Sequence, residues 1–173
     1  MSWQEPAWPV EASHNELAGL GRLAALEAQV TRAMWFALRP IADLSLEEWR
    51  EWKGRKLRSL TAEMLRHTPA VEELLHDSVV HFDELRGPAQ KKRRVVLKLI
   101  LADPLRHGDG CIYARHDIDG ALHAALAAMT ELTFAARVVH LRAATLISKG
   151  QLQERPATER GPTMKIGRQL WRI

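Results

Sequence analysis

The chain has 173 residues, of which 46% are hydrophobic and 27% charged, values ordinary for one globular domain with its own core. The single cysteine, Cys111, excludes an internal disulfide and a zinc site built from paired cysteines. The net charge is +4, and residues 150–173 carry five basic residues against two acidic ones. Most of the excess charge therefore belongs to the tail, and the basic balance alone does not mark the rest of the chain as a nucleic-acid binder.

Three segments are expected. Residues 1–13, which hold two prolines and two tryptophans, form an irregular leader without the basic and apolar regions of a signal peptide. Residues 14–149 form a helical bundle domain, and residues 150–173 form a flexible basic tail. No uninterrupted apolar run approaches the roughly 18 residues that a membrane-spanning helix needs. We therefore expect a cytoplasmic protein that does not meet a membrane.

The first helix is predicted from Asn15 to Arg39, where Pro40 ends it because the residue before a proline avoids the helical region. Large apolar residues recur within it at spacings of three and four, the pattern of one buried helix face. They are Leu17, Leu20, Leu23, Val30, Met34 and Leu38.

A second helix is predicted from Ser45 to about His67. Ser45 and Glu48 have the spacing of a capping box, in which each side chain bonds the other residue's backbone N–H. Gly54 weakens this helix in the middle because glycine has a low helix propensity.

A third helix follows, with Thr68 as its N-cap and Pro69 at the first helical position. Glu72 and Glu73 suit the positive end of the helix dipole. The pair Gly87-Pro88 is expected to break or kink the helix.

Residues 95–115 leave two alternatives open. The apolar run 95–101 is short enough to be a strand or the end of a helix, and periodicity alone does not separate the two. Turn-forming residues fill 103–110, and 111–115 has the composition of a short strand, so we favour a small β-hairpin.

The last helix is predicted from Ile118 to Ser148, capped by Asp117 and ended by Gly150. Its predicted buried face is Leu122, Leu126, Met129, Leu132, Ala136, Val139, Ala143 and Leu146. The fold expected from these elements is mainly α, a bundle of four to five helices with a small β-hairpin before the last long helix.

This layout resembles the HEPN-like domains, in which a helix ends in a pattern of the type Arg-Asn-x-Ile-Val-His-Gly. The segment from Lys92 to Lys98 falls where that pattern would fall, and Asp103-Pro104 and the glycine-rich segment 108–113 match its usual sequel. The resemblance covers roughly residues 15–148. It implies a helical bundle, homodimerisation and a role in stress response, phage defence or RNA binding.

The catalytic pair of the family does not carry over. Active members resemble one another in an Arg and a His that act on the RNA phosphodiester, and on this register those positions hold Lys92 and Leu97. Leucine cannot transfer a proton, so acid–base catalysis fails there. The resemblance therefore implies a protein without the family's ribonuclease activity.

Four adjacent cations, Lys91, Lys92, Arg93 and Arg94, are candidates for phosphate contacts. The competing interpretation is a solvated helix end, where basic side chains suit the negative pole of the dipole. We expect this second interpretation to hold more often for such a cluster.

The eight histidines invite two further hypotheses. Glu73 and His76 form one Glu-x-x-His motif, and Asp77 and His81 share a helix face at a spacing of four. Nothing in the sequence fixes a third ligand for His76 and His81, so no metal site and no cofactor are expected. His107 and His116, with Arg115 beside them, could form a general acid–base pair next to a phosphate-binding guanidinium. The same residues also suit an ordinary turn.

Three functions follow from this sequence. The first is a non-catalytic HEPN-like protein that acts through homodimerisation or by binding a protein partner. The second is an RNase-type phosphodiester enzyme that uses His107 and His116. The third is a nucleic-acid-binding accessory protein that uses residues 91–94 and the tail. We expect the chain not to be an enzyme.

Overall fold

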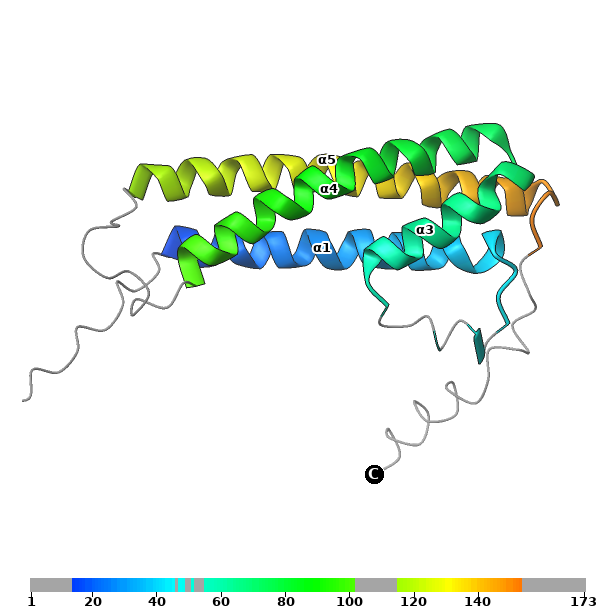
Figure 1. Cartoon of the computed structure of the whole chain (residues 1–173), viewed down its shortest axis with the longest axis horizontal. Helices are drawn as coiled ribbons and strands as arrows, with labels where there is room; N and C mark the ends of the chain where they lie inside the picture. Colours follow the sequence, from blue (N-terminus) through cyan, green and yellow to red (C-terminus); the bar gives the residue numbers. More distant parts are fainter. Residues whose placement is uncertain (1–13, 46, 49–50, 52–54, 102–114, 154–173) are drawn as a thin grey trace, which may run out of the picture. The chain divides into compact units, whose positions relative to one another are not determined.

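A computed structural model of the whole chain describes residues 14–45, 47–48, 51, 55–101 and 115–153. Its elements are α1 (His14–Ile41), α3 (Leu57–His67), the 3-10 helix η1 (Thr68–Ala70), α4 (Glu73–Leu101) and α5 (Arg115–Ser148) (Figure 1). The protein is mainly α, as predicted. No strand occurs among the residues that the structure describes.

The contacts between residues group into two units. The first unit contains the described residues of 1–29 and 84–133, which are the first half of α1, the second half of α4 and the first half of α5. The second contains those of 30–83 and 134–173, which add α3 and η1 to the remaining halves of the long helices.

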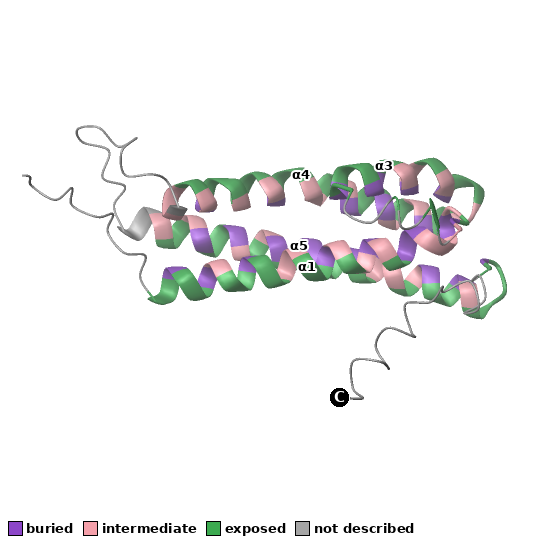
Figure 2. Cartoon of the chain, turned by 90° about the horizontal axis from the view of Figure 1, so that it is seen from below, coloured by how far each residue is buried: buried purple, intermediate pink, exposed green. Residues whose placement is uncertain are grey.

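In both units the buried apolar residues are spaced mostly three, four or seven residues apart along each helix. Figure 2 shows buried segments recurring along each ribbon, with exposed segments between them. This is the pattern of helices that need packing against one another to be stable in water. The largest fully buried side chains are Leu23, Leu132, Met129 and Val96 in the first unit, and Val30, Met34, Leu38, Leu60, Met64, Leu75, Val79 and Phe82 in the second.

The α1 helix ends two residues later than predicted, because Pro40 lies inside its last turn. Beyond Ile41, Asp43 adopts a left-handed φ of 48°, and the Leu44 N–H bonds the Arg39 carbonyl at 3.1 Å. This is a Schellman ending, in which the left-handed residue lets the chain turn back over the last open carbonyls. Proline alone does not end this helix.

The predicted capping box is confirmed. The Ser45 N–H donates to Glu48 Oε2 at 2.8 Å, and the Glu48 N–H donates to Ser45 Oγ at 3.2 Å. The single helix predicted from Ser45 to His67 is wrong, because Arg55 and Lys56 are not helical and Lys56 is extended. The chain therefore starts a separate helix, α3, at Leu57.

The N-cap predicted at Thr68 is also wrong. Thr68 lies in η1, and its Oγ1 faces His76 Nδ1 at 2.9 Å. Glu72 caps α4 instead, since its Oε2 accepts the Leu75 N–H at 2.7 Å. A glutamate one turn nearer to the helix takes the role that the sequence suggested for the threonine.

Of the break or kink predicted at Gly87-Pro88, the break does not occur, because α4 runs through both residues to Leu101. Ala89 and Val96 are both buried, seven residues apart, so one packed stripe continues past the proline. Packing of that stripe outweighs the backbone hydrogen bond that Pro88 cannot make.

The first strand of the predicted hairpin is wrong, because residues 95–101 are the last two turns of α4. Val95 is 45% exposed while its neighbour Val96 is buried, and Ala89 is buried one heptad before Val96. Burial therefore follows a helical period through this run. The rest of the hairpin, residues 102–114, lies outside the described residues.

The α5 helix starts at Arg115, so Asp117 is inside it rather than its N-cap. Its predicted buried face is confirmed except at Leu126, which is half-buried. Gly150 ends it as predicted, with φ 71°, and the Gln151 N–H bonds the Leu146 carbonyl at 2.9 Å. Leu152 beyond it is buried, so ordered packing extends past Gly150.

Candidate functional site

The predicted basic cluster lies on the second half of α4, in the first unit. Lys91, Lys92 and Arg94 are exposed, and so is Lys98 one turn further on. Arg93 differs from its neighbours, because its guanidinium forms an ion pair with Glu27 of α1 and its side chain is 24% exposed. The four adjacent cations therefore divide into three that face solvent and one that joins two helices.

Lys92 and Leu97, the two residues aligned with the catalytic Arg and His of the resembling family, do not form one site. Lys92 is exposed and Leu97 is half-buried, and five residues of α-helix turn them about 140° apart. The side chain at the expected histidine position is aliphatic and faces a different side of α4 from Lys92. This arrangement offers no pair for acid–base chemistry.

The second catalytic hypothesis concerns His107, His116 and Arg115. His107 lies outside the described residues. Arg115 and His116 occupy the first turn of α5, and their side chains lie outside the described part of the chain. The hypothesis of an acid–base pair there stays a prediction.

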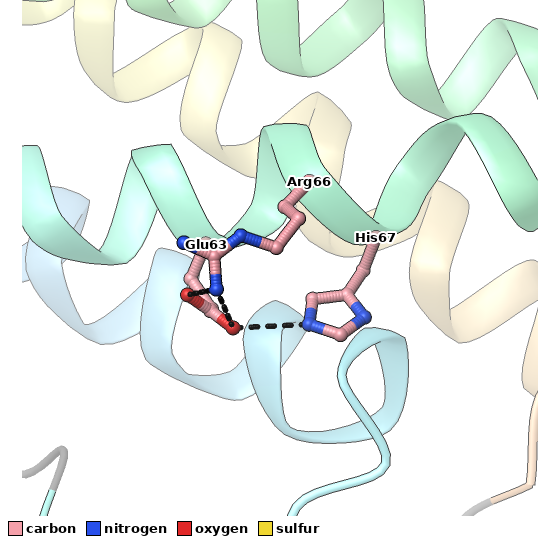
Figure 3. Close-up of polar contacts among 3 residues, drawn as sticks. All are labelled: Glu63, Arg66 and His67. Carbon is pink, nitrogen blue, oxygen red and sulfur yellow. Dashed lines mark hydrogen bonds and ion pairs between the residues drawn. The ribbon is translucent and has the colours of Figure 1, made fainter.

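One polar cluster joins three residues on α3. Glu63 Oε2 pairs with Arg66 Nη1 at 3.1 Å, and Glu63 Oε1 lies 3.0 Å from His67 Nε2 (Figure 3). Glu63 is largely covered, with its side chain 15% exposed, while the Arg66 side chain is 72% exposed. Both contacts are local to one helix, so the cluster is typical of a helix surface and not of a catalytic site.

The histidines of α4 do not assemble into a metal site. His76 faces Thr68, and His81 is exposed one turn further along the helix. Among the residues that the structure describes, no group of three His, Cys, Asp or Glu side chains is arranged to hold a metal ion.

A second surface, in the second unit, was not singled out by the sequence. Phe134 and Leu141 of α5 are 70% and 64% exposed and lie seven residues apart, so they share one face of the helix. Both lie on the side of α5 opposite its buried stripe. An exposed apolar face of this kind marks a surface that binds a partner more often than a single exposed leucine does.

Beside this face, Phe36 of α1 is 50% exposed and meets His140 of α5 edge to face, with 6.1 Å between ring centroids. Arg32 lies over the same Phe36 ring, with its guanidinium carbon 5.7 Å from the ring centroid. A cation, an aromatic ring and an imidazole therefore converge at the edge of α5. We name the pair Phe134 and Leu141 the apolar face.

One signal in the sequence could have found the apolar face. Phe134 and Leu141 fall outside the buried stripe predicted for the last helix, and large apolar residues off that stripe have no place in the core. Nothing in the sequence indicates the contact between Phe36 and His140, which are 104 positions apart.

Residues Ile118–Ser148 are also long and apolar enough to cross a membrane by length and composition. The expectation from the sequence rested on uninterrupted apolar runs, whereas α5 meets the requirement through its mean hydropathy although polar residues interrupt its apolar runs. The core helix of a soluble protein meets the same requirement. The absence of a membrane partner stays a prediction.

No protein-family model, no curated protein and no solved structure matches this chain.

Proposed function

We propose that this chain is a non-catalytic, HEPN-like helical protein that works as a homodimer, with the exposed side of α5 as its interface. The observation that carries the proposal is the pair Phe134 and Leu141, both more than 60% exposed on one helix face. Leaving two large apolar side chains in water costs about 1.5–3 kcal/mol each relative to full burial. A partner that covers them recovers this free energy.

The charges on the same side of α5 favour a second copy of the chain as that partner. Glu131 and Arg137 lie three residues before and three residues after Phe134, and both are exposed. Two antiparallel copies of α5 related by a two-fold axis at Phe134 bring Glu131 of one copy to the same height along the helix pair as Arg137 of the other, twice, with the two charges on opposite flanks of the Phe134 contact. Self-complementarity of this kind is what a two-fold interface requires.

The charge pattern also determines where along α5 the two-fold axis lies, and so which residues of the two copies face each other. An axis halfway between Phe134 and Leu141 would pair these two side chains but would bring the two copies of Arg137 together. Like charges across an interface are unfavourable. The register centred on Phe134 instead stacks Phe134 on its own copy and places Leu141 over Ala127, which is also exposed.

Sedimentation velocity over a concentration range of micromolar to hundreds of micromolar tests the proposal. The wild-type chain is expected to dimerise, and Phe134→Glu is expected to weaken the dimer at least about tenfold, because a buried aromatic at the centre of an interface contributes more than about 1.4 kcal/mol. Leu74→Glu is the matched control, since Leu74 is 53% exposed and belongs to α4, not to α5. A wild-type monomer throughout this range contradicts the proposal.

A further inference from the structure

The exposed side of α4 carries a row of cations that the proposed dimer does not use. Lys91, Arg94 and Lys98 are exposed and are spaced by three and four residues, so they lie along one face of the helix. Val95, 45% exposed, lies between them. At about 1.5 Å per residue, the row is about 10 Å long.

No acidic residue neutralises this row on its own helix. From Leu85 to Leu101, α4 contains no Asp or Glu. Arg93 of the same stretch forms an ion pair with Glu27 of α1, so its guanidinium faces α1 and not the row. Among the residues that the structure describes, no acidic side chain of α4 and no ion pair neutralises the three exposed cations, and their charge can act on a ligand.

We propose that the row formed by Lys91, Arg94 and Lys98 binds the phosphate backbone of a nucleic acid without reading its sequence. One strand of a duplex carries one phosphate per about 3.4 Å of axis, so a row of about 10 Å meets about three phosphates. The outer side of a helix is convex, and such a surface fits the groove of a nucleic-acid duplex or a bent single strand of nucleic acid. Val95 supplies an apolar contact between the cations, and no exposed aromatic side chain lies among them to stack on a base.

Fluorescence anisotropy with labelled 20-nucleotide RNA and DNA, single-stranded and duplex, measures this binding between 50 and 300 mM salt. The wild-type chain is expected to bind with a dissociation constant of about 1–100 µM and with an affinity that falls as salt rises. Replacing Lys91, Arg94 and Lys98 together by Gln is expected to weaken binding at least about tenfold. The salt slope should fall by about 2 for single strands and about 3 for duplexes.

The matched control replaces Lys56, Arg58 and Lys149 by Gln, which removes the same charge from three exposed cations elsewhere. It is expected to keep the wild-type salt slope. The single variant Arg94→Gln should lower the slope by about one third of the triple variant's effect, so the test does not depend on one heavily altered chain.

Three results overturn the proposal. The first is equal loss of binding in both triple variants, which would make net charge the only cause. The second is binding that does not respond to salt, or no binding at 50 mM salt. The third is equally tight, equally salt-dependent binding of polyglutamate of matched charge, which would assign the row to acidic protein instead of nucleic acid.

Discussion

Gly19 of α1 lies against Leu122 of α5, so closely that a Cβ on Gly19 would stand 2.9 Å from Leu122 Cδ1 and 3.0 Å from its Cγ. Leu122 is buried and cannot move into solvent without losing its packing. The absence of a side chain at position 19 therefore sets how closely the two helices approach in the first unit.

Gly19→Ala is expected to destabilise the protein by about 1–3 kcal/mol, because the added methyl group overpacks the site and displaces Leu122. Gly21→Ala is the control in the same helix, where an added Cβ meets nothing within 4 Å. It should stabilise the protein by about 0.5–1 kcal/mol through helix propensity alone. Urea unfolding followed by circular dichroism measures both, and a shift of the same sign in the two variants would contradict the close approach.

The ion pair between Glu27 and Arg93 is partly exposed on both sides, at 37% and 24%. A double-mutant cycle with Glu27→Gln and Arg93→Gln should give a coupling free energy of about 0.2–1 kcal/mol, because solvent screens the pair. The cycle of Glu27→Gln with Arg94→Gln serves as the reference, since Arg94 is exposed, and should give a coupling near zero. Equal coupling free energies in both cycles would mean that Glu27 interacts with the summed charge of the basic cluster 91–94 and not specifically with Arg93.

Pro88 lies inside α4, where its ring nitrogen cannot donate to the carbonyl of Glu84. Pro88→Ala is expected to raise the free energy of unfolding by more than about 1 kcal/mol, because it restores a helix hydrogen bond at an exposed position. Thermal denaturation measures the change. A lower melting temperature for Pro88→Ala would show that the proline sets a bend on which packing depends.

Glu72 holds the first turn of α4 by accepting the Leu75 N–H at 2.7 Å. Glu72→Ala is expected to cost about 0.5–2 kcal/mol, the usual range for loss of a helix N-cap. Glu73→Ala removes a charge from the next position, which has only the helix dipole to interact with, and should cost less than about 1 kcal/mol. If the two variants unfold at the same urea concentration, the capping bond contributes nothing beyond its charge.

The helical character of this chain could be predicted because the pattern of apolar residues repeats over many turns. The buried stripe of α5 extends from Leu122 to Leu146 and matches the prediction almost throughout. Local bonding patterns were predictable as well, since the capping box at Ser45 and the ending at Gly150 depend only on neighbouring residues.

The errors arise where tertiary packing outweighs a local signal. Pro88 did not interrupt α4, because Ala89 and Val96 remain buried on one stripe. The run 95–101 is too short for its period to be decided from the sequence, and the helix that precedes it extends through it.

The two candidate surfaces differ in how far the sequence could predict them. The basic cluster was visible as four adjacent cations, but only the structure separates Arg93, which pairs with Glu27, from the exposed row. The contact between Phe36 and His140 joins two helices and depends on how they pack, which no local pattern encodes.

The most direct test of the proposed dimer is a charge-reversal experiment on α5. Glu131→Arg and Arg137→Glu are each expected to raise the dissociation constant of the dimer about three- to tenfold, because each places like charges level with one another across the two-fold axis. The double variant, with both charges reversed, should return the dissociation constant to within about twofold of the wild type. Sedimentation equilibrium that shows the double variant as weak as, or weaker than, the two single variants would contradict the antiparallel pairing of α5 and the interface built on it.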